Sequence, residues 1–513
     1  MLPYISRMMI RIYKILLPLC VSSWIAAQSP DELIRRGQER IYTLDFKSAD
    51  AVFDSLIALD PLHPRGYFFK GSSYFYQILS GHNTRMTGDE FEKWNDKTVE
   101  VAEQYAAQAH QETEGDFYRG AAYGNSARYH AVHGEFVKAF YYAKRSKSLH
   151  EDVIEADPLY YDAYLSIGMY NYYAAAAPRW MDAIGSLFGL SGDRATGIAQ
   201  LEKTYRHGKI FNLEAQFFLA NVYLEEGDYE TSLRIFSQLM DRFRSNPYLI
   251  NQAGMVSFYL ENYSVAEQIF QQSILQTSQT TRSAEMLASY FLGRMARLRG
   301  DYTKAITYFN QSVTIADQCV LFKMVDGWVA GSALYYLAET YELSGDRTKA
   351  EIWYEKARDD ARSGKGIVQG AKNRLKYPIG EFEMEFIKIR QKALIQPEPS
   401  QLITLNTMLA SASNIPEMAK YVSQIHYYIG RTQFALENYP EAERHFTASL
   451  DTQTDDGEEK WRTAFNRYYR GAARVKLGKK SEAKSDLKLL TDDASYVDGN
   501  RIRFRAQQLL KGL

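Results

Sequence analysis

Cysteine is scarce in this sequence, with two residues among 513. Cys20 lies in an N-terminal segment that we expect to be removed, which leaves Cys319 alone in the mature chain. A single cysteine excludes an intrachain disulfide. Because Cys319 lies in the apolar run from Ile315 to Val325, we expect it to pack as a small hydrophobic side chain.

Proline and net charge are low as well. The chain has 13 prolines, and its 61 basic and 62 acidic residues give a net charge of −1. Loss of the N-terminal segment removes three basic residues and no acidic one, which leaves 58 against 62, or −4. A mildly acidic chain without a basic stripe argues against a nucleic-acid partner.

Acidic residues are absent from the first 27 positions, where three basic residues precede an apolar run from Ile15 to Ala27. This order is typical of a secretory signal peptide. The run is short for a membrane-spanning helix, which needs roughly 20 apolar residues. Leucine precedes Cys20, where a lipoprotein signal has a small residue. We therefore expect a signal peptide over residues 1–27, cleaved near Ala27, and export to the periplasm or envelope without lipidation.

Motifs of enzymes are missing too, since the sequence has no GxSxG elbow, HExxH pair or Cys–His couple. His130 and His133 have a spacing at which two imidazoles could share a metal on one helix face, but no further ligands accompany them. Gly364, Gly366 and Gly370 match neither the dinucleotide fingerprint nor the phosphate loop, and indicate a flexible connection. We expect no catalysis, no cofactor and no metal.

What the sequence does contain is a repeated unit, clearest over residues 211–241. Two apolar-striped segments are separated there by Gly227-Asp228. The first stripe includes Phe217 and Ala220, and the second includes Ser232 and Phe236, each at the spacing of one helical face. Neither helix can bury its stripe alone, so the unit needs similar units on both sides.

The signature recurs with a period of 34 residues, as from Ser232 to Ala266. In the second segment a small residue precedes a large apolar one by four positions, at Ala49/Phe53, Ser232/Phe236, Ala266/Phe270, Ala305/Phe309, Ala350/Tyr354, Ala442/Phe446 and Ala483/Leu487. Twelve positions before each small residue stands another small one, at Gly37, Ala220, Gly254, Gly293, Ala338, Gly430 and Gly471. Paired helices can cross closely at such positions.

On these residues the chain resembles the tetratricopeptide-repeat family, with about ten units over most of the mature chain. The resemblance implies an all-α fold, an α-solenoid of about ten helix pairs that forms a right-handed superhelix. The Tyr-rich residues 157–180 and the segment 189–203 resemble a subgroup of exported bacterial repeat proteins and, more faintly, eukaryotic inclusion-clearance repeat proteins of the mitochondrial outer membrane. The family implies a scaffold whose concave groove holds a protein or peptide partner.

The pattern of repeats and breakers predicts four segments. These are the signal peptide at 1–27, an N-terminal array at 28–362, an irregular linker with a lone helix at 363–400, and a C-terminal pair of repeats with a capping helix at 401–513. The lone helix is expected at EFEMEFIKIRQKALI, between breaker-rich stretches.

One position of the repeat is mostly aromatic. Three residues before the small residue of the first helix stand Phe68, Phe217, Tyr290, Tyr335, Tyr427 and Tyr468. These rings could fill the seam between neighbouring first helices, as aromatic stripes usually do. They could also line a trough that stacks on an extended peptide, a sugar or a lipid.

Two insertions interrupt the array, near residues 80–97 and 174–192. Gly71 to Ala102 spans 31 residues and Gly168 to Gly197 spans 29, against 12 elsewhere, so 19 and 17 residues are added. Loops two repeats apart can face each other, so we expect the binding site here. The second insertion carries an apolar face of Trp180, Met181, Ile184, Leu187 and Phe188.

This apolar face has two interpretations. It folds as a lid over a tyrosine floor near Tyr164, Tyr172 and Tyr173, or it meets a partner or the envelope membrane in a peripheral contact. The second function that the sequence leaves open is therefore a carrier of a lipid or small apolar ligand under the inserted loops. The double substitution Trp180→Ala and Phe188→Ala distinguishes the two, because a lid loses thermal stability and a docking face loses its partner.

The N-terminal segment yields the first testable prediction. N-terminal sequencing of protein from the native host should find a mature chain that begins near Gln28, because a signal peptidase cuts after a small residue that follows the apolar run. Acylated Cys20, or an intact segment 1–27, would show a membrane anchor instead.

Overall fold

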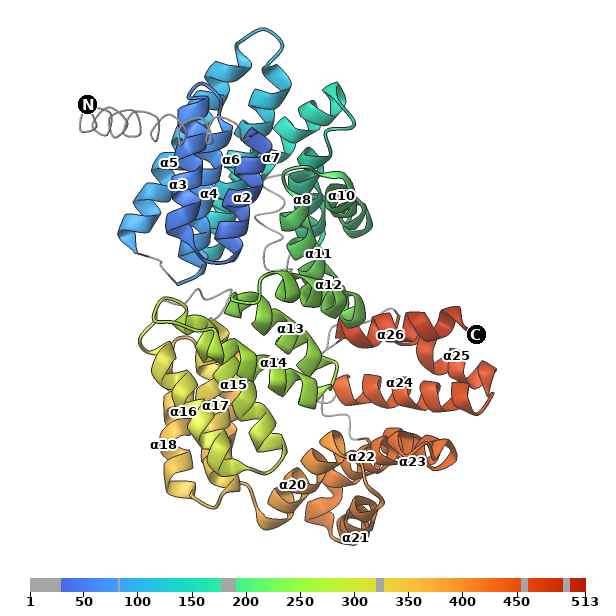
Figure 1. The fold of residues 1–513 in the computed structure, drawn as a ribbon. Helices are drawn as coiled ribbons and strands as arrows, with labels where there is room; N and C mark the ends of the chain where they lie inside the picture. Colours follow the sequence, from blue (N-terminus) through green and yellow to red (C-terminus); the bar gives the residue numbers. More distant parts are fainter. Residues whose placement is uncertain (1–28, 82–83, 177–190, 320–326, 454–459, 492–498) are drawn as a thin grey trace, which may run out of the picture. The chain divides into compact units, whose positions relative to one another are not determined.

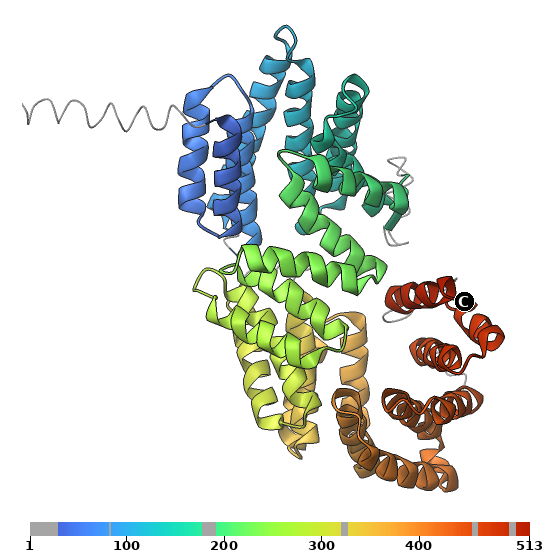
Figure 2. The same cartoon turned by 45° about the vertical axis from the view of Figure 1, so that its right-hand side comes forward.

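The computed structural model describes residues 29–81, 84–176, 191–319, 327–453, 460–491 and 499–513. Over these residues the chain forms 24 α-helices and two short 3-10 helices, with no strand. Figures 1 and 2 show these helices in two views. The all-α solenoid expected from the sequence is confirmed. The signal peptide and the apolar face at 180–188 lie outside the described residues. None of the described helices is long and apolar enough to cross a membrane.

The chain divides into two compact units, residues 1–216 and 217–513. The helices of the first unit are α2 (Pro30–Tyr42), α3 (Phe46–Leu59), α4 (Arg65–Leu79), α5 (Arg85–Ala106), α6 (Glu112–Val132), α7 (Phe136–Ala156), η1 (Tyr161–Ala163), α8 (Tyr164–Ala176) and α10 (Arg194–His207). Helix α11 (Asn212–Glu226) begins in the first unit and ends in the second.

The second unit continues with further helix pairs and ends in a closing helix. Its elements are α12 (Tyr229–Arg242), α13 (Pro247–Tyr259), α14 (Tyr263–Leu275), α15 (Arg282–Leu298), α16 (Tyr302–Ala316), α17 (Gly327–Leu343), α18 (Arg347–Asp359), α19 (Lys365–Lys376), α20 (Glu381–Ile395), α21 (Pro399–Asn414), η3 (Pro416–Tyr421), α22 (Val422–Ala435), α23 (Tyr439–Asp451), α24 (Lys460–Lys476), α25 (Lys480–Lys488) and α26 (Gly499–Lys511).

In most pairs whose first helix carries the glycine of the repeat signature, that glycine meets a ring of the second helix. A Cβ atom at Gly293 would lie 2.8 Å from the Phe309 ring, and one at Gly430 would lie 2.8 Å from the Phe446 ring. Both rings are fully buried. The two small residues and the ring recognised in the sequence are therefore the contact that holds a pair together.

The turns inside the pairs explain the Gly-Asp signature. Gly300 has φ 79° and Gly345 has φ 90°, a left-handed backbone that glycine adopts without a steric cost. The following Asp301 and Asp346 cap α16 and α18, because their carboxylates accept hydrogen bonds from backbone N–H groups at 3.1 and 3.0 Å. Glycine ends the turn, and aspartate starts the next helix.

The insertion near residues 80–97 differs from the expected loop. Most of it forms the first turns of α5, which begins at Arg85 behind a Thr84 capping box. Phe91 is 1% exposed, and the Trp94 ring stacks on Tyr67 of α4 at 6.3 Å. The added residues are helical because their apolar side chains find partners on α4 and α6.

The stretch 363–400 also differs from the predicted irregular linker. The lone helix is present as α20, but the glycine-rich residues expected to be flexible form α19. The first unit ends near residue 216, while the helices on both sides of 363–400 belong to the second unit. The boundary between two apolar clusters does lie within the stretch 363–400. One cluster has buried residues from Phe258 to Ala371, and the other from Phe386 to Ala506.

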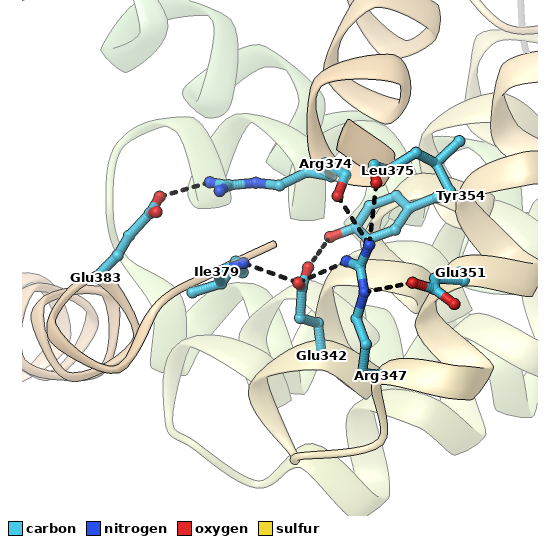
Figure 3. A network of polar contacts seen from close by, with 8 residues as sticks. All are labelled: Glu342, Arg347, Glu351, Tyr354, Arg374, Leu375, Ile379 and Glu383. Atoms are coloured by element: carbon cyan, nitrogen blue, oxygen red, sulfur yellow. Dashed lines mark hydrogen bonds and ion pairs between the residues drawn. The ribbon is translucent and has the colours of Figure 1, made fainter. Parts of the chain in front are cut away.

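A buried carboxylate explains why this stretch is ordered (Figure 3). Glu342 of α17 is 3% exposed and accepts hydrogen bonds from Arg347, from the Tyr354 hydroxyl at 2.8 Å and from the Ile379 backbone N–H at 2.8 Å. These partners come from α18 and from the segment between α19 and α20. One carboxylate therefore ties the last regular repeat to the following helices.

The helix-crossing contact predicts that two glycine substitutions shift the melting temperature in opposite directions. Gly293→Ala should lower the melting temperature, because its new methyl group overpacks against Phe309 at a cost of about 1–3 kcal/mol. Gly366→Ala in α19 should raise it, since nothing lies within 4 Å of the added atom and alanine is favoured in a helix by about 0.5–1 kcal/mol. Thermal denaturation followed by circular dichroism measures both, and equal shifts would contradict the crossing argument.

Candidate binding site: arginines on the first helices of the repeats

The aromatic residues predicted to line a groove have two environments. Phe68, Tyr290, Tyr427, Tyr164 and Tyr172 are buried, whereas Phe217, Tyr335 and Tyr468 are half-buried and Tyr173 is 37% exposed. Tyr290 meets Trp328 of the next first helix edge-to-face at 5.5 Å. The buried rings therefore pack in the seam between first helices, and the half-buried rings keep an accessible edge.

The two histidines considered as metal ligands have separate contacts. His130 lies against Glu135, and His133 lies 2.7 Å from the Tyr129 carbonyl oxygen. In the described part of the chain, no three His, Cys, Asp or Glu residues are placed to hold a metal ion. The apolar face at 180–188 is not described, so its role as lid or docking face stays a prediction.

A feature that the sequence interpretation missed is an arginine directly after the small residue of the first helix. It occurs in three repeats, at Arg128 of α6, Arg294 of α15 and Arg431 of α22. The signal was present in the sequence as Ala-Arg or Gly-Arg, but the repeats between them carry other residues at this position. Arginine presents five N–H donors in a fork that matches a carboxylate.

Two of the three arginines are neutralised by a glutamate of the chain itself. In the first unit Arg128 pairs with Glu214, whose side chain is 9% exposed. In the second unit Arg431 donates to Glu261 at 2.9 Å, and Arg501 approaches the same carboxylate at 3.3 Å. Burial would raise the pKa of Glu261, but Arg431 and Arg501 lower it below its ordinary value.

Arg294 differs because no carboxylate among the described residues pairs with it. Its half-buried guanidinium lies over aromatic rings, 4.5 Å from the centre of Phe258 and 5.3 Å from that of Tyr336. Ring faces stabilise the positive charge of the guanidinium in part. They do not accept hydrogen bonds from its N–H groups, which point outward in the plane of the guanidinium. The site around Arg294 thus presents positive charge and unused donors.

The surroundings of Arg294 and Arg431 are built from the same side chains in the same order. Each arginine follows a tyrosine by four residues, and that tyrosine meets a tryptophan of the next first helix and a phenylalanine of the second helix. The first set is Tyr290, Arg294, Phe309, Trp328 and Tyr336, and the second is Tyr427, Arg431, Phe446, Trp461 and Tyr469. We call them the Arg294 cluster and the Arg431 cluster.

Ring geometry shows how closely the two clusters agree. The Tyr290–Trp328 rings are 5.5 Å apart at 88°, and the corresponding pair in the Arg431 cluster is 6.1 Å apart at 87°. The Phe309–Tyr336 rings stack at 6.1 Å and 16°, and their counterparts stack at 5.8 Å and 20°. One local architecture is therefore present twice, and within the described part of the chain only the Arg431 copy holds a carboxylate.

A hollow of about 310 Å³ lies elsewhere, between α6 and α7. Its lining includes Glu112, Asp116, Asp152 and Glu155. Burial and the neighbouring carboxylates raise the pKa of Asp116, although Arg119 opposes them. The hollow is acidic, but the structure shows no cation ligand set there, so it adds no separate site.

The fold and the repeated helix crossings define the class of the protein as an α-helical solenoid of paired helices. The tetratricopeptide-repeat model matches residues 252–318, so this chain contains tetratricopeptide repeats. Such repeats generally mediate protein–protein interactions. No curated protein matches the sequence.

Three solved structures align with most of this chain at low identity. Yeast Tom70 is 13% identical, covers 91% of this chain and 93% of its own, and has a TM-score of 0.32. A chain of the APC/C hetero-tetramer Cut9–Hcn1 is also 13% identical, with 94% of this chain and 98% of that chain covered and a TM-score of 0.25. The human IFIT1 dimer with m7Gppp-AAAA is 12% identical, covers 84% and 91%, and has a TM-score of 0.36.

Near the Arg431 cluster, two histidines make a contact that acid should disrupt. The Nδ1 atoms of His426 and His445 are 2.9 Å apart, and the His445 side chain is 4% exposed. Burial, Arg444 and His426 lower the pKa of His445 to about 4. The fold therefore holds His445 neutral where an exposed histidine would begin to take up a proton.

The His445 site predicts a loss of stability in mild acid. The pKa of His445 is lower in the folded than in the unfolded chain. Its contribution to the free energy of unfolding is therefore full above pH 6.5 and falls as the pH drops toward 4. At pH 5 the free energy of unfolding should be lower by about 2 kcal/mol than at neutral pH. Urea unfolding at pH 7.5 and pH 5 tests this, and His445→Gln should show a smaller decrease, because glutamine does not titrate. An identical decrease in both proteins would contradict the assignment.

Proposed function

We propose that this chain is an exported tetratricopeptide-repeat scaffold that binds a protein or peptide partner, and that Arg294 anchors an acidic group of that partner. The observation that carries the proposal is the comparison of three equivalent arginines. Among the described residues, the chain supplies a glutamate to Arg128 and to Arg431 but none to Arg294. The missing carboxylate is the group that a partner would bring.

Energetics favour a carboxylate over a neutral ligand at this position. A half-buried guanidinium loses hydration, and its interactions with Phe258 and Tyr336 replace only part of it. A carboxylate forms two parallel charge-assisted hydrogen bonds with the arginine fork. A hydrogen bond to a charged group contributes about 1.5–3 kcal/mol.

The aromatic residues beside Arg294 suit the apolar neighbours of such an acid. Trp328 is 36% exposed, while Tyr335 and Tyr336 are half-buried on the same helix, α17. Tyrosine and tryptophan offer large apolar surface at a small entropic cost, which is why binding surfaces contain many of them. A peptide with an acidic residue flanked by apolar ones matches this arrangement.

Export is supported by the N-terminal pattern of basic residues followed by an apolar run. The envelope is therefore the compartment in which to search for the partner. Chemical crosslinking in cells of the native host, followed by purification of this chain and mass spectrometry, would identify it. The alternative carrier function depends on residues 180–188, and extraction of the purified protein with organic solvent would detect a retained lipid.

The anchoring role of Arg294 predicts a specific loss of binding. Arg294→Gln should weaken capture of the crosslinked partner roughly 10- to 100-fold, the value of one charge-assisted hydrogen bond or bidentate pair. Arg299→Gln, at the C-cap that follows the same helix, is the control, because Arg299 pairs at the surface with Glu267. Calorimetry with the identified partner measures both. Equal affinity in wild type and Arg294→Gln would refute the anchor.

A further inference from the structure

We infer that the Arg431 cluster is a second carboxylate-binding site of the same kind as the Arg294 cluster, kept closed by Glu261 acting as an internal ligand. The inference rests on the proposed function and deepens it. It assigns two acidic-peptide sites to the second unit and states that one of them is masked in the free protein.

Glu261 has the contacts that a bound acidic residue would make. Its Oε2 accepts a hydrogen bond from Arg431 at 2.9 Å, and Arg431 also donates to the Tyr427 hydroxyl at 3.1 Å. The Arg431 guanidinium lies 4.3 Å from the centre of the Tyr469 ring. The carboxylate therefore completes a site whose other side chains are repeated around Arg294, where no described residue adds a carboxylate.

The backbone of Glu261 supports this assignment. Glu261 occupies the turn between α13 and α14 with φ 66°, at the repeat position where Gly227, Gly300 and Gly345 stand in the neighbouring turns. Residues other than glycine rarely adopt a backbone conformation with positive φ. A glutamate there presents its carboxylate to α22, which glycine could not do.

The contacts that hold Glu261 in place are polar and open to competition. Arg501 of α26 reaches Glu261 at 3.3 Å, and Asn500 donates to the Glu225 carbonyl oxygen at 2.8 Å. The apolar side of α26, with Ile502 and Ala506, belongs instead to the C-terminal cluster. Release of Glu261 therefore breaks ion pairs and hydrogen bonds but leaves the apolar core of α24–α26 intact.

The chain contains a matched control for Glu261. Glu437 occupies the equivalent turn between α22 and α23 with φ 61°, is exposed, and forms no ion pair among the described residues. Glu261→Gln and Glu437→Gln change the same residue type in the same backbone conformation. Only the first removes a carboxylate from an arginine cluster.

The test measures binding stoichiometry by calorimetry with the full chain. The probe is a short peptide of alternating glutamate and alanine, and its glutamine–alanine counterpart is the control. Wild type and Glu437→Gln should bind one equivalent of the acidic peptide, and Glu261→Gln should bind two. Adding Arg431→Gln to Glu261→Gln should return the stoichiometry to one.

The outcomes separate this inference from the proposed function. One equivalent bound by Glu261→Gln, with loss of binding in Arg294→Gln, would overturn the inference and leave the proposed function standing. Binding that appears only in Glu261→Gln and requires Arg431 would support the inference and count against Arg294. No binding by any variant would overturn both.

A second measurement needs no substitution at Glu261 and remains valid if that variant folds poorly. Excess acidic peptide should displace Glu261 in the wild-type protein and expose Arg501, which is 4% exposed. Hydrogen exchange over residues 259–263 should accelerate by about tenfold, as expected when a local contact opens. The glutamine peptide should have no effect, and unchanged rates with the acidic peptide would overturn the inference.

Discussion

The structure depends on one steric constraint, the close crossing of two helices at a position where the first helix carries almost no side chain. At Gly37, Gly254, Gly293, Gly430 and Gly471 a Cβ atom would fall within about 3 Å of the second helix's ring or leucine. The ring fills the space above the glycine and also contacts the next repeat, as Phe270 does when its face stacks on Phe291 at 5.0 Å. Each crossing therefore supports both its own pair and the following one.

The same crossing determines where charge can be placed. The residue after the glycine lies one step around the first helix, next to the aromatic seam and half-buried. An arginine at this position sits among rings, where dispersion and cation–π contacts stabilise its stem and face while its in-plane donors still need acceptors. Glu214 and Glu261 supply those acceptors from distant segments of the chain, whereas Arg294 has none among the described residues. In the proposed function, the difference between a structural ion pair and a binding site is thus one carboxylate.

Sequence reasoning reached the fold but only part of the site. The small residues and rings recur at constant spacing, so the helix pairs could be recognised without any distant contact, and the aromatic positions were recognised too. The insertion near 80–97 was misjudged, because Phe91 and Trp94 become part of a helix only when α4 and α6 offer them partners. Residues 363–376 were misjudged for a similar reason. Their glycines predicted flexibility, but the residues form helix α19, and the buried Glu342 bonds to Arg347 before this helix and to the Ile379 N–H after it.

The sequence by itself determined the local unit, because helical periodicity, the glycine turn and the aspartate cap act within about 34 residues, the length of one repeat. Tertiary structure alone decided which charges are satisfied. Arg431 and Glu261 are 170 residues apart, and Arg128 and Glu214 are 86 apart. No local pattern couples such residues, because their proximity depends on the small rotation that each repeat adds to the next. That geometry brings a glutamate to two of the three arginines, and none of the described residues brings one to Arg294.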